Sequence, residues 1–233
     1  MKPYYEHAGI TIYHGDCREV LPQLEAESIV TDPIWPNSVF DDVNPQQLLA
    51  QALQDAPGQR VVIHLGCDSD PRFLEAVPKR WPFLRTCWLD YARPSYKGRI
   101  LYGSDVAYVF GTPPPPAQGR MVLPGKCMAQ RTGEKIQREI GGPTSAQKNY
   151  RRNKQTVGRA HPCPRRIQHV QWLVKFFAGS SLIDPFVGSG TTLLAAKRLG
   201  IPAIGIEIEE KYCEIAAKRL SQEVFDFREV RSD

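Results

Sequence analysis

The chain has 233 residues, 42% of them hydrophobic and 24% charged, and a mass of 26.3 kDa. This size fits one α/β domain, or one core domain with a modest insertion. No apolar stretch approaches the roughly 20 residues of a membrane-spanning helix, and the N-terminus lacks the apolar run of a secretory signal. The six cysteines form no CxxC pair, which argues against a disulfide framework or a metal site and predicts reduced thiols in the cytoplasm.

Positive charge is concentrated in one segment. Residues 112–166 carry twelve Lys or Arg and two acidic residues, whereas the rest of the chain carries eighteen basic and twenty-three acidic residues. A basic segment on a mildly acidic body predicts an insertion that binds a polyanion, with a solvated loop as the alternative. Four prolines at 113–116 mark a stiff exit from the core. We therefore expect a catalytic core of residues 1–111 and 161–233 and a basic insertion over 112–160.

Short apolar runs that end in turns predict the strands. In chain order they cover residues 10–13, 28–31, 60–65, 86–89, 105–110, 181–184 and 203–206. Apolar residues spaced along one face predict helices over residues 18–24, 44–53, 167–177, 191–199 and 209–222. The aromatic and basic stretch 91–103 is expected to be a connecting loop. Alternation of strands and helices indicates a Rossmann-like, doubly wound α/β sheet.

The two ends of the chain each supply part of such a sheet. The last third has the order strand, Gly-rich turn, helix, strand and helix, which is half of a doubly wound sheet. The strands at 10–13 and 28–31 would supply the missing neighbours. Joining the end of the chain to its beginning would complete one continuous sheet, so the order is predicted to be circularly permuted.

The Gly-rich turn after residues 181–184 is the first candidate binding site. Asp184 is followed by Pro-Phe-Val-Gly188-Ser-Gly190-Thr-Thr, which lets a ligand approach the backbone at a helix N-terminus. The turn lacks the Lys of a phosphate-binding loop and the third Gly of a dinucleotide fingerprint. Glu207 ends the next strand, where an acid can bind ribose hydroxyls. This combination predicts a nucleoside cofactor without a pyrophosphate, namely S-adenosylmethionine.

The same turn, together with Gly205-Ile-Glu207-Ile and the helix that follows, resembles the cofactor half of DNA amino-methyltransferases. These enzymes methylate adenine N6 or cytosine N4. Tyr13-His-Gly-Asp16 and Ser28-Ile-Val-Thr-Asp32-Pro33 are similar to the permuted subgroup, in which the catalytic half precedes the cofactor half. The resemblance covers the chain except for the basic insertion, and it implies the methyltransferase fold of that family.

The tetrapeptide Asp32-Pro33-Ile34-Trp35 resembles the family's catalytic Asp-Pro-Pro-aromatic motif, with Ile34 in place of the second Pro. An exocyclic amine on a base is a poor nucleophile because its lone pair is delocalised into the ring. The Asp32 carboxylate and the Pro33 carbonyl can each accept one N–H of that amine and so localise the lone pair. Trp35 can stack on a base flipped out of the duplex. Asp32, Pro33 and Trp35 are therefore the expected catalytic residues.

The resemblance also implies the binding residues. Asp16 would bind the adenine amino group of the cofactor, and Glu207 would bind its ribose. The other implied cofactor residues are His161, Pro162, Asp184, Phe186, Gly188, Ser189, Gly190 and Thr191. His161-Pro-Cys-Pro-Arg165-Arg166 departs from the Lys-Pro that is usual in this segment of the family. Phosphate contacts to DNA are expected from Lys148, Arg151, Arg152, Lys154 and Arg159 in the insertion.

These residues predict a DNA methyltransferase that uses S-adenosylmethionine and acts on adenine N6. Adenine is favoured because, by resemblance, Asp more commonly opens the tetrapeptide in adenine enzymes and Ser in cytosine enzymes. Cytosine N4 in DNA, another acceptor such as RNA, and an inactive DNA-binding homologue stay open as alternatives; an oxidoreductase is the weakest. Double-stranded DNA is the expected partner and no membrane is expected. The sequence leaves open a homodimer and a cognate restriction nuclease.

Overall fold

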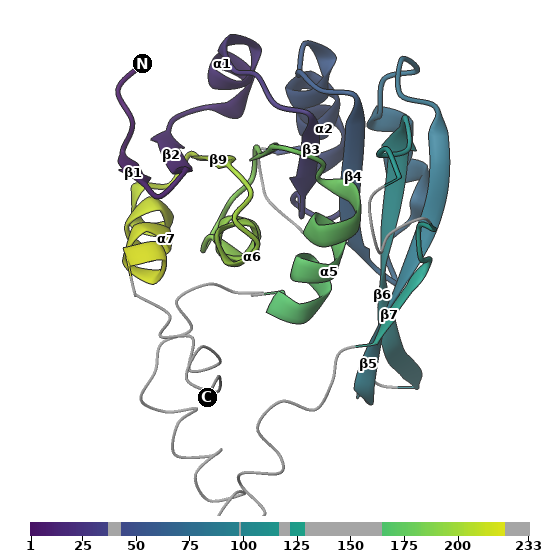
Figure 1. Ribbon diagram of the computed structural model, residues 1–233. Coiled ribbons are helices and arrows are strands. Elements are labelled where there is room, and N and C mark those ends of the chain that lie inside the picture. The colour runs from purple at the N-terminus through teal and green to yellow at the C-terminus, as the bar shows by residue number, and fades with distance from the viewer. Residues whose placement is uncertain (37–42, 98, 117–121, 129–164, 222–233) are drawn as a thin grey trace, which may run out of the picture.

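The computed structural model describes residues 1–36, 43–97, 99–116, 122–128 and 165–221, which form a nine-stranded sheet and its covering helices (Figure 1). The strands are β1 (Tyr5–His7), β2 (Ile10–His14), β3 (Ser28–Thr31), β4 (Arg60–Gly66), β5 (Phe83–Lys97), β6 (Ile100–Gly111), β7 (Lys126–Met128), β8 (Leu182–Asp184) and β9 (Ala203–Glu207). The helices are α1 (Cys17–Val20), α2 (Pro45–Gln54), α5 (Ile167–Phe177), α6 (Thr191–Arg198) and α7 (Glu210–Ser221), with short 3-10 helices η1 (Leu21–Gln23) and η2 (Pro71–Ala76). The strand order is β1-β2-β9-β8-β3-β4-β6-β5-β7.

The first and the last strands of the chain lie side by side. β2 pairs in parallel with β9, in a register that places Ile10 opposite Ala203, and β3 pairs in parallel with β8. β8 also pairs in parallel with β9, and β3 with β4, so five strands form one parallel block. The α/β sheet that the sequence predicts, completed by joining the two ends of the chain, is therefore confirmed.

Residues that alternate along the central strands pack on opposite faces of the sheet. Val61 of β4 and Ile29 of β3 belong to the core shared with α1, η1 and α2. Val62 and Val30, the next residues of each strand, belong to the core shared with α5, α6 and α7. Figure 1 shows these two groups of helices on either side of the sheet. Both faces of the parallel block are thus covered, as parallel strands require.

The helices follow the predicted ranges closely, and α5 has the predicted bounds. α2 begins after Asn44, whose side chain accepts the backbone N–H of Gln47 at 3.0 Å, and Pro45 occupies its first turn. Among the described residues, no helix combines the length and the apolar character needed to cross a membrane.

Residues 91–103 form the outer part of a β-hairpin, so the prediction of a connecting loop there is wrong. β5 and β6 pair antiparallel as far as the tip, where Lys97 lies opposite Ile100. The ladder is interrupted at an irregular stretch that includes Pro94, which has no N–H to donate. This interruption breaks the regular alternation by which a strand is recognised in a sequence.

The sequence also does not predict β1, η2 or β7. β7 falls inside the stretch 112–160 that is predicted as an insertion, and it adds a parallel strand to the sheet beside β5. The described parts of this stretch are residues 112–116 and 122–128, and the remainder lies outside the described residues. The division into a catalytic core and a DNA-recognition insertion stays a prediction.

Arg60, at the start of β4, is 1% exposed and joins three parts of the fold. Its guanidinium donates to the carbonyl oxygens of Thr112 at 2.7 Å and Phe177 at 3.0 Å, and it pairs with Glu27 at 3.2 Å. We expect Arg60→Ala to lower the free energy of unfolding by about 3 kcal/mol, because buried acceptors lose their donor. Urea unfolding followed by circular dichroism measures this change.

Arg72→Ala is the matched control, because Arg72 forms its ion pair with Asp70 on the exposed surface. Removing a surface pair should leave the free energy of unfolding nearly unchanged. If both variants lost the same stability, the destabilisation of Arg60→Ala would not come from its buried contacts.

Candidate active site

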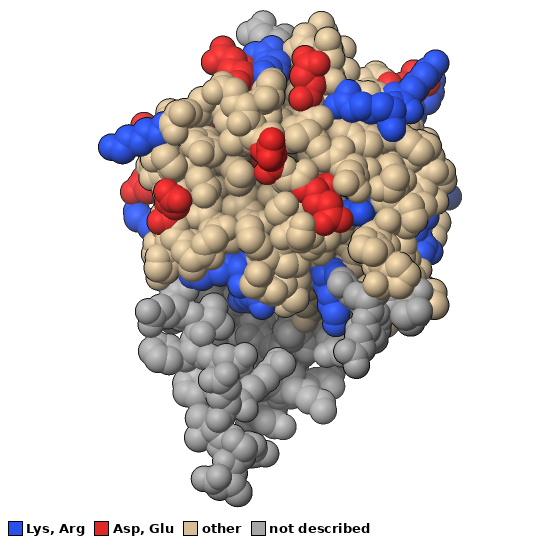
Figure 2. All heavy atoms as spheres, turned by 45° about the horizontal axis from the view of Figure 1, so that its top comes forward, with Lys and Arg blue, Asp and Glu red and all other residues tan. Residues whose placement is uncertain are grey.

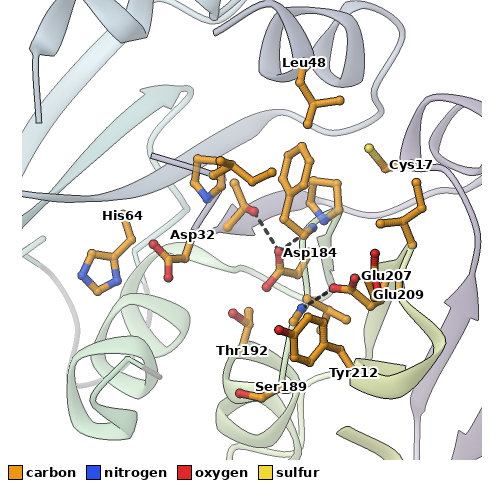
Figure 3. A pocket seen from close by; sticks show the side chains of 18 of the residues that line it. Cys17, Asp32, Leu48, His64, Asp184, Ser189, Thr192, Glu207, Glu209 and Tyr212 are labelled. Atoms are coloured by element: carbon orange, nitrogen blue, oxygen red, sulfur yellow. Dashed lines mark hydrogen bonds between the residues drawn. The ribbon is translucent and has the colours of Figure 1, made fainter. Parts of the chain in front are cut away.

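Four carboxylates lie where four neighbouring parallel strands end. Asp16 and Asp32 shortly follow β2 and β3, and Asp184 and Glu207 are the last residues of β8 and β9. The carboxyl ends of parallel strands share one edge of the sheet, and here these groups line a cavity of about 900 Å³ (Figure 3). The structure thus gathers both predicted groups, catalytic and cofactor-binding, at one site.

Most of the residues predicted from the sequence line this cavity. They are Asp16, Asp32, Pro33, Trp35, Asp184, Phe186, Gly188, Ser189, Thr191 and Glu207. Gly190 caps the N-terminus of α6 in the same turn. His161, Pro162, Lys148, Arg151, Arg152, Lys154 and Arg159 lie outside the described residues, and their roles stay predictions.

The turn between β8 and α6 requires a left-handed backbone at two glycines. Gly188 has a φ of 50° and Gly190 a φ of 81°. A Cβ placed on Gly190 would also lie 2.9 Å from the Cβ of Ala216 in α7. Glycine at position 190 therefore allows both the turn and the close packing of α7, and it leaves the start of α6 directed at the cavity.

Asp184 is buried and ties the ends of β3 and β8 together. Its Oδ1 accepts hydrogen bonds from the hydroxyl of Thr31 at 2.8 Å and from the backbone N–H of Phe186 at 3.1 Å. Burial raises the pKa of Asp184 to about 6, although these hydrogen bonds and one from Thr192 favour the carboxylate, and the nearby charge of Asp32 adds to the rise. This carboxyl group is therefore placed to hold the site in shape.

The raised pKa of Asp184 predicts a pH-dependent stability. Its ordinary pKa of 3.8 applies to the unfolded chain and a pKa of about 6 to the folded protein, so the folded state holds more protons between these values. The free energy of unfolding should fall as pH rises from about 4 to about 6, by about 3 kcal/mol from this group. Asp184→Asn should remove that fall. Urea unfolding of both proteins at pH 4 and pH 7 measures it, and an equal pH dependence in the two would contradict the assignment.

Glu207 links β9 to the Gly-rich turn. Its Oε2 accepts the backbone N–H of Gly188 at 2.8 Å, and its Oε1 accepts that of Glu209 at 2.9 Å. Burial raises the pKa of Glu207, although the two N–H groups favour its charged form. Each carboxylate oxygen keeps further lone-pair capacity, so a fixed acceptor faces the cavity.

Asp16 caps the N-terminus of α1 at another side of the cavity. It accepts the backbone N–H of Arg18 at 2.9 Å and forms an ion pair with the Arg18 guanidinium at 2.5 Å. The side-chain hydrogen bond from Arg18 is the main cause that lowers the pKa of Asp16. Arg18 also donates to Gln51 of α2 at 3.0 Å, so Asp16 is held as a charged acceptor.

Asp32 and Trp35 contact each other, and both contact Arg165. The indole N–H of Trp35 donates to Asp32 Oδ1 at 2.7 Å, and Arg165 Nε donates to Asp32 Oδ2 at 2.6 Å. The Arg165 guanidinium lies over the Trp35 ring, with its carbon 3.8 Å from the ring centroid. Gly66 at the end of β4 leaves room for the indole, because a Cβ there would lie 2.3 Å from the Trp35 ring.

A second buried carboxylate lies next to this group. Asp105 of β6 accepts hydrogen bonds from the Tyr91 hydroxyl at 2.5 Å and from His64 Nε2 at 3.2 Å. Arg165 Nη1 is 3.9 Å from the same Asp105 oxygen. Burial alone would raise the pKa of Asp105, but the hydrogen bonds from His64 and Tyr91 and the charges of His64 and Arg165 lower it overall. Asp105 is therefore a buried anion beside the Asp32–Trp35 tetrapeptide.

Comparison with known proteins identifies the family. The family model of N6/N4 DNA methylases matches residues 28–218. The chain belongs to this family. The matched range includes the Asp32–Trp35 tetrapeptide, the Gly-rich turn and Glu207. Membership of the family confirms the resemblance seen in the sequence and the prediction of S-adenosylmethionine as the cofactor.

Individual relatives match over shorter segments. The type II methyltransferase M2.DpnII of Streptococcus pneumoniae is 58% identical over 45 residues, which are 19% of this chain and 17% of that protein. The type II methyltransferase M.ScaI of Streptomyces caespitosus is 41% identical over 66 residues, 28% of this chain and 22% of that protein. The matched segments thus span well under a third of either relative.

Solved structures are similar to this protein over nearly its whole length. The complex of M1.HpyAVI with S-adenosylmethionine has a TM-score of 0.62 at 20% identity and covers 91% of this chain and 100% of that chain. The cytosine-N4-specific PvuII DNA methyltransferase has a TM-score of 0.63 at 17% identity, and the match covers 95% of this chain and 90% of that chain. At these identities the similarity establishes the fold.

The sequence did not predict several residues of this site. Asp105, His64 and Tyr91 come from separate strands and carry no local motif. Arg165 belongs to a pair of basic residues just before α5, inside a segment that resembles the family. The position of that pair in the sequence, after Pro162-Cys-Pro164 and before an amphipathic helix, is the signal that could have directed attention to it.

Charge on the surface of this protein differs between regions. Turned so that the top of Figure 1 comes forward, the described face carries separate acidic side chains among mostly uncharged residues (Figure 2). Lys and Arg side chains lie around the edges of this view, both along its lower border and at its upper right. A polyanion would therefore be attracted to the border rather than to the centre of this face.

Proposed function

We propose that this protein transfers a methyl group from S-adenosylmethionine to the exocyclic amine of a base in double-stranded DNA, with adenine N6 as the target. The observation that carries the proposal is the placement of Asp32 and Pro33 in one cavity with the Gly-rich turn and Glu207. A methyl donor and an amine acceptor must meet in such a cavity for direct transfer.

The residues around the turn fit a nucleoside cofactor. Glu207 presents a buried carboxylate with remaining lone pairs, as two ribose hydroxyls require. Asp16 offers a second charged acceptor for the adenine amino group, and the turn from Gly188 to Thr191 would hold the methionine end. The cavity of about 900 Å³ is large enough for a ligand of this size with space beside it.

When bound, S-adenosylmethionine supplies the methyl group as a sulfonium, whose S–CH₃ bond breaks while the N–CH₃ bond forms. Asp32 and the Pro33 carbonyl would each accept one N–H of the target amine. These contacts draw the nitrogen toward a tetrahedral shape and direct its lone pair at the donor. The amine must also lose one proton, and Asp32 is the acceptor beside it.

A base in a duplex must leave the stack before it reaches Asp32. Flipping costs a few kcal/mol, and stacking on an aromatic side chain recovers part of it. Trp35 provides that aromatic face, which the Arg165 guanidinium covers in this structure. Adenine is proposed over cytosine because Asp32 opens the tetrapeptide, and the basic stretch 112–160 supports DNA as the partner.

Nucleoside mass spectrometry of plasmid DNA from a methylase-free host that expresses this chain tests the proposal. N6-methyladenine is the expected product, and a host with the Asp32→Ala variant is the control. N4-methylcytosine would keep the mechanism and replace the target base. Absence of both marks, in a protein that binds S-adenosylmethionine, would overturn DNA as the acceptor; RNA from the same cells would then be analysed.

A further inference from the structure

Arg165 lies in the position that the target nucleobase must occupy in the proposed reaction. It precedes Arg166, the N-cap of α5, and its side chain reaches back to the end of β3 with 14% exposure. There it is stacked 3.8 Å from the centre of the Trp35 ring and donates to Asp32 at 2.6 Å. The two residues expected to stack on the base and to accept its amine are thus already in contact with a side chain.

The chemistry of the guanidinium matches that of the target. Adenine and cytosine each present a planar N–C–NH₂ unit at the edge that carries the exocyclic amine. A guanidinium is also a planar N–C–N unit with N–H donors, and it stacks on aromatic faces. Asp32 has one oxygen occupied by the indole of Trp35 and the other by Arg165. A base stacked on the Trp35 face that Arg165 covers would occupy the same space as the guanidinium, so the two cannot fill this position together.

We propose that Arg165 occupies the target-base site in the DNA-free protein and is displaced when a base is flipped in. This inference rests on the proposed function. Arg165 covers the indole face of Trp35 and gives the Asp32 carboxylate a charged partner in addition to the indole N–H. The flipped base then competes with Arg165 for both, so Arg165 sets part of the cost of base entry and favours release of the methylated base.

The neighbouring carboxylate gives the displaced side chain a second partner. Asp105 Oδ2 is 3.9 Å from Arg165 Nη1 and is already held by Tyr91 and His64. A rotation of the guanidinium away from Trp35 would bring it closer to Asp105 and keep the cation paired, while Asp32 accepts the N–H of the base. The Arg165 guanidinium would move from one carboxylate, Asp32, to another, Asp105. The free energy of this movement is small compared with that of burying an unpaired cation.

Steady-state methylation of unmethylated plasmid DNA by the full chain tests the exchange, with KM for DNA and kcat measured separately. Arg165→Ala should lower KM for DNA about tenfold, which corresponds to about 1.4 kcal/mol, and should not lower kcat. Arg165→Lys keeps the charge but cannot stack as a plane, so it should lower KM about threefold, by about 0.6 kcal/mol. The lysine variant also answers the question if the alanine variant does not fold.

Arg166→Ala is the matched control, because Arg166 carries the same charge one residue away and lies 4.5 Å from the centre of the Tyr91 ring. It should leave KM unchanged or raise it through a lost phosphate contact. A KM that stays the same or rises in both Arg165 variants, or a loss of kcat at constant KM, would overturn the exchange and make Arg165 a positioning residue for Asp32. A wild type that binds S-adenosylmethionine but methylates no DNA would instead overturn the proposed function, and this inference with it.

Discussion

Asp32→Ala is expected to reduce the rate of methyl transfer by at least about 1000-fold, the size of effect produced when a required proton acceptor is removed. The carboxylate has two tasks in the proposed mechanism: it accepts an N–H of the amine and it takes up the proton that leaves. The dissociation constant of S-adenosylmethionine should change little, because Asp32 makes its observed contacts with Trp35 and Arg165 rather than with the turn or Glu207. Single-turnover methylation and calorimetric titration of the cofactor measure the two quantities.

Asp32→Asn separates the loss of the carboxylate from the loss of the side chain. The amide keeps an oxygen that can accept from Trp35, but it is a weak proton acceptor and a weaker partner for Arg165. We expect a loss of rate close to that of the alanine variant, with Trp35 held in place. If cofactor affinity and rate fell together in both variants, Asp32 would be a structural residue of the cavity and not a catalytic one.

The parts of the site that could be predicted are those carried by local sequence. A short apolar strand followed by an acid places the acid at the carboxyl edge of a parallel sheet, and this rule brought Asp32, Asp184 and Glu207 to one cavity. Glycine at a positive φ gives the turn a sequence signature at Gly188 and Gly190. Permutation was also readable, because each end of the chain lacks the strands that the other end supplies.

The parts that could not be predicted depend on pairing between distant segments. The hairpin of β5 and β6 is interrupted by a bulge, so its outer half has no regular alternation. Asp105 becomes a buried anion only because the sheet places Tyr91 and His64 against it. Arg165 is far from Asp32 in the chain, and no spacing rule connects a residue before α5 with the end of β3.

Glu207→Gln is expected to raise the dissociation constant of S-adenosylmethionine about 100-fold, or about 2.7 kcal/mol. The carboxylate is the proposed acceptor for the ribose hydroxyls, and hydrogen bonds to a charged, desolvated acceptor are worth about 1.5–3 kcal/mol each. The amide also turns an NH₂ group toward one of the two backbone N–H groups, of Gly188 or Glu209, that the carboxylate now satisfies. Calorimetric titration with the cofactor at pH 8 measures the effect.

Glu209→Gln provides the matched control within the same cavity. The Glu209 side chain is exposed and pairs with Lys211 at 2.9 Å, and its backbone N–H still reaches Glu207 in the variant. We expect the affinity of this variant for the cofactor to stay within about threefold of the wild type, since an exposed ion pair contributes little. Because burial raises the pKa of Glu207, affinity in the wild type should also weaken as pH falls and the carboxylate is protonated. Equal losses of affinity in the two variants would indicate a general effect of negative charge, and the ribose would then have to be assigned to another residue.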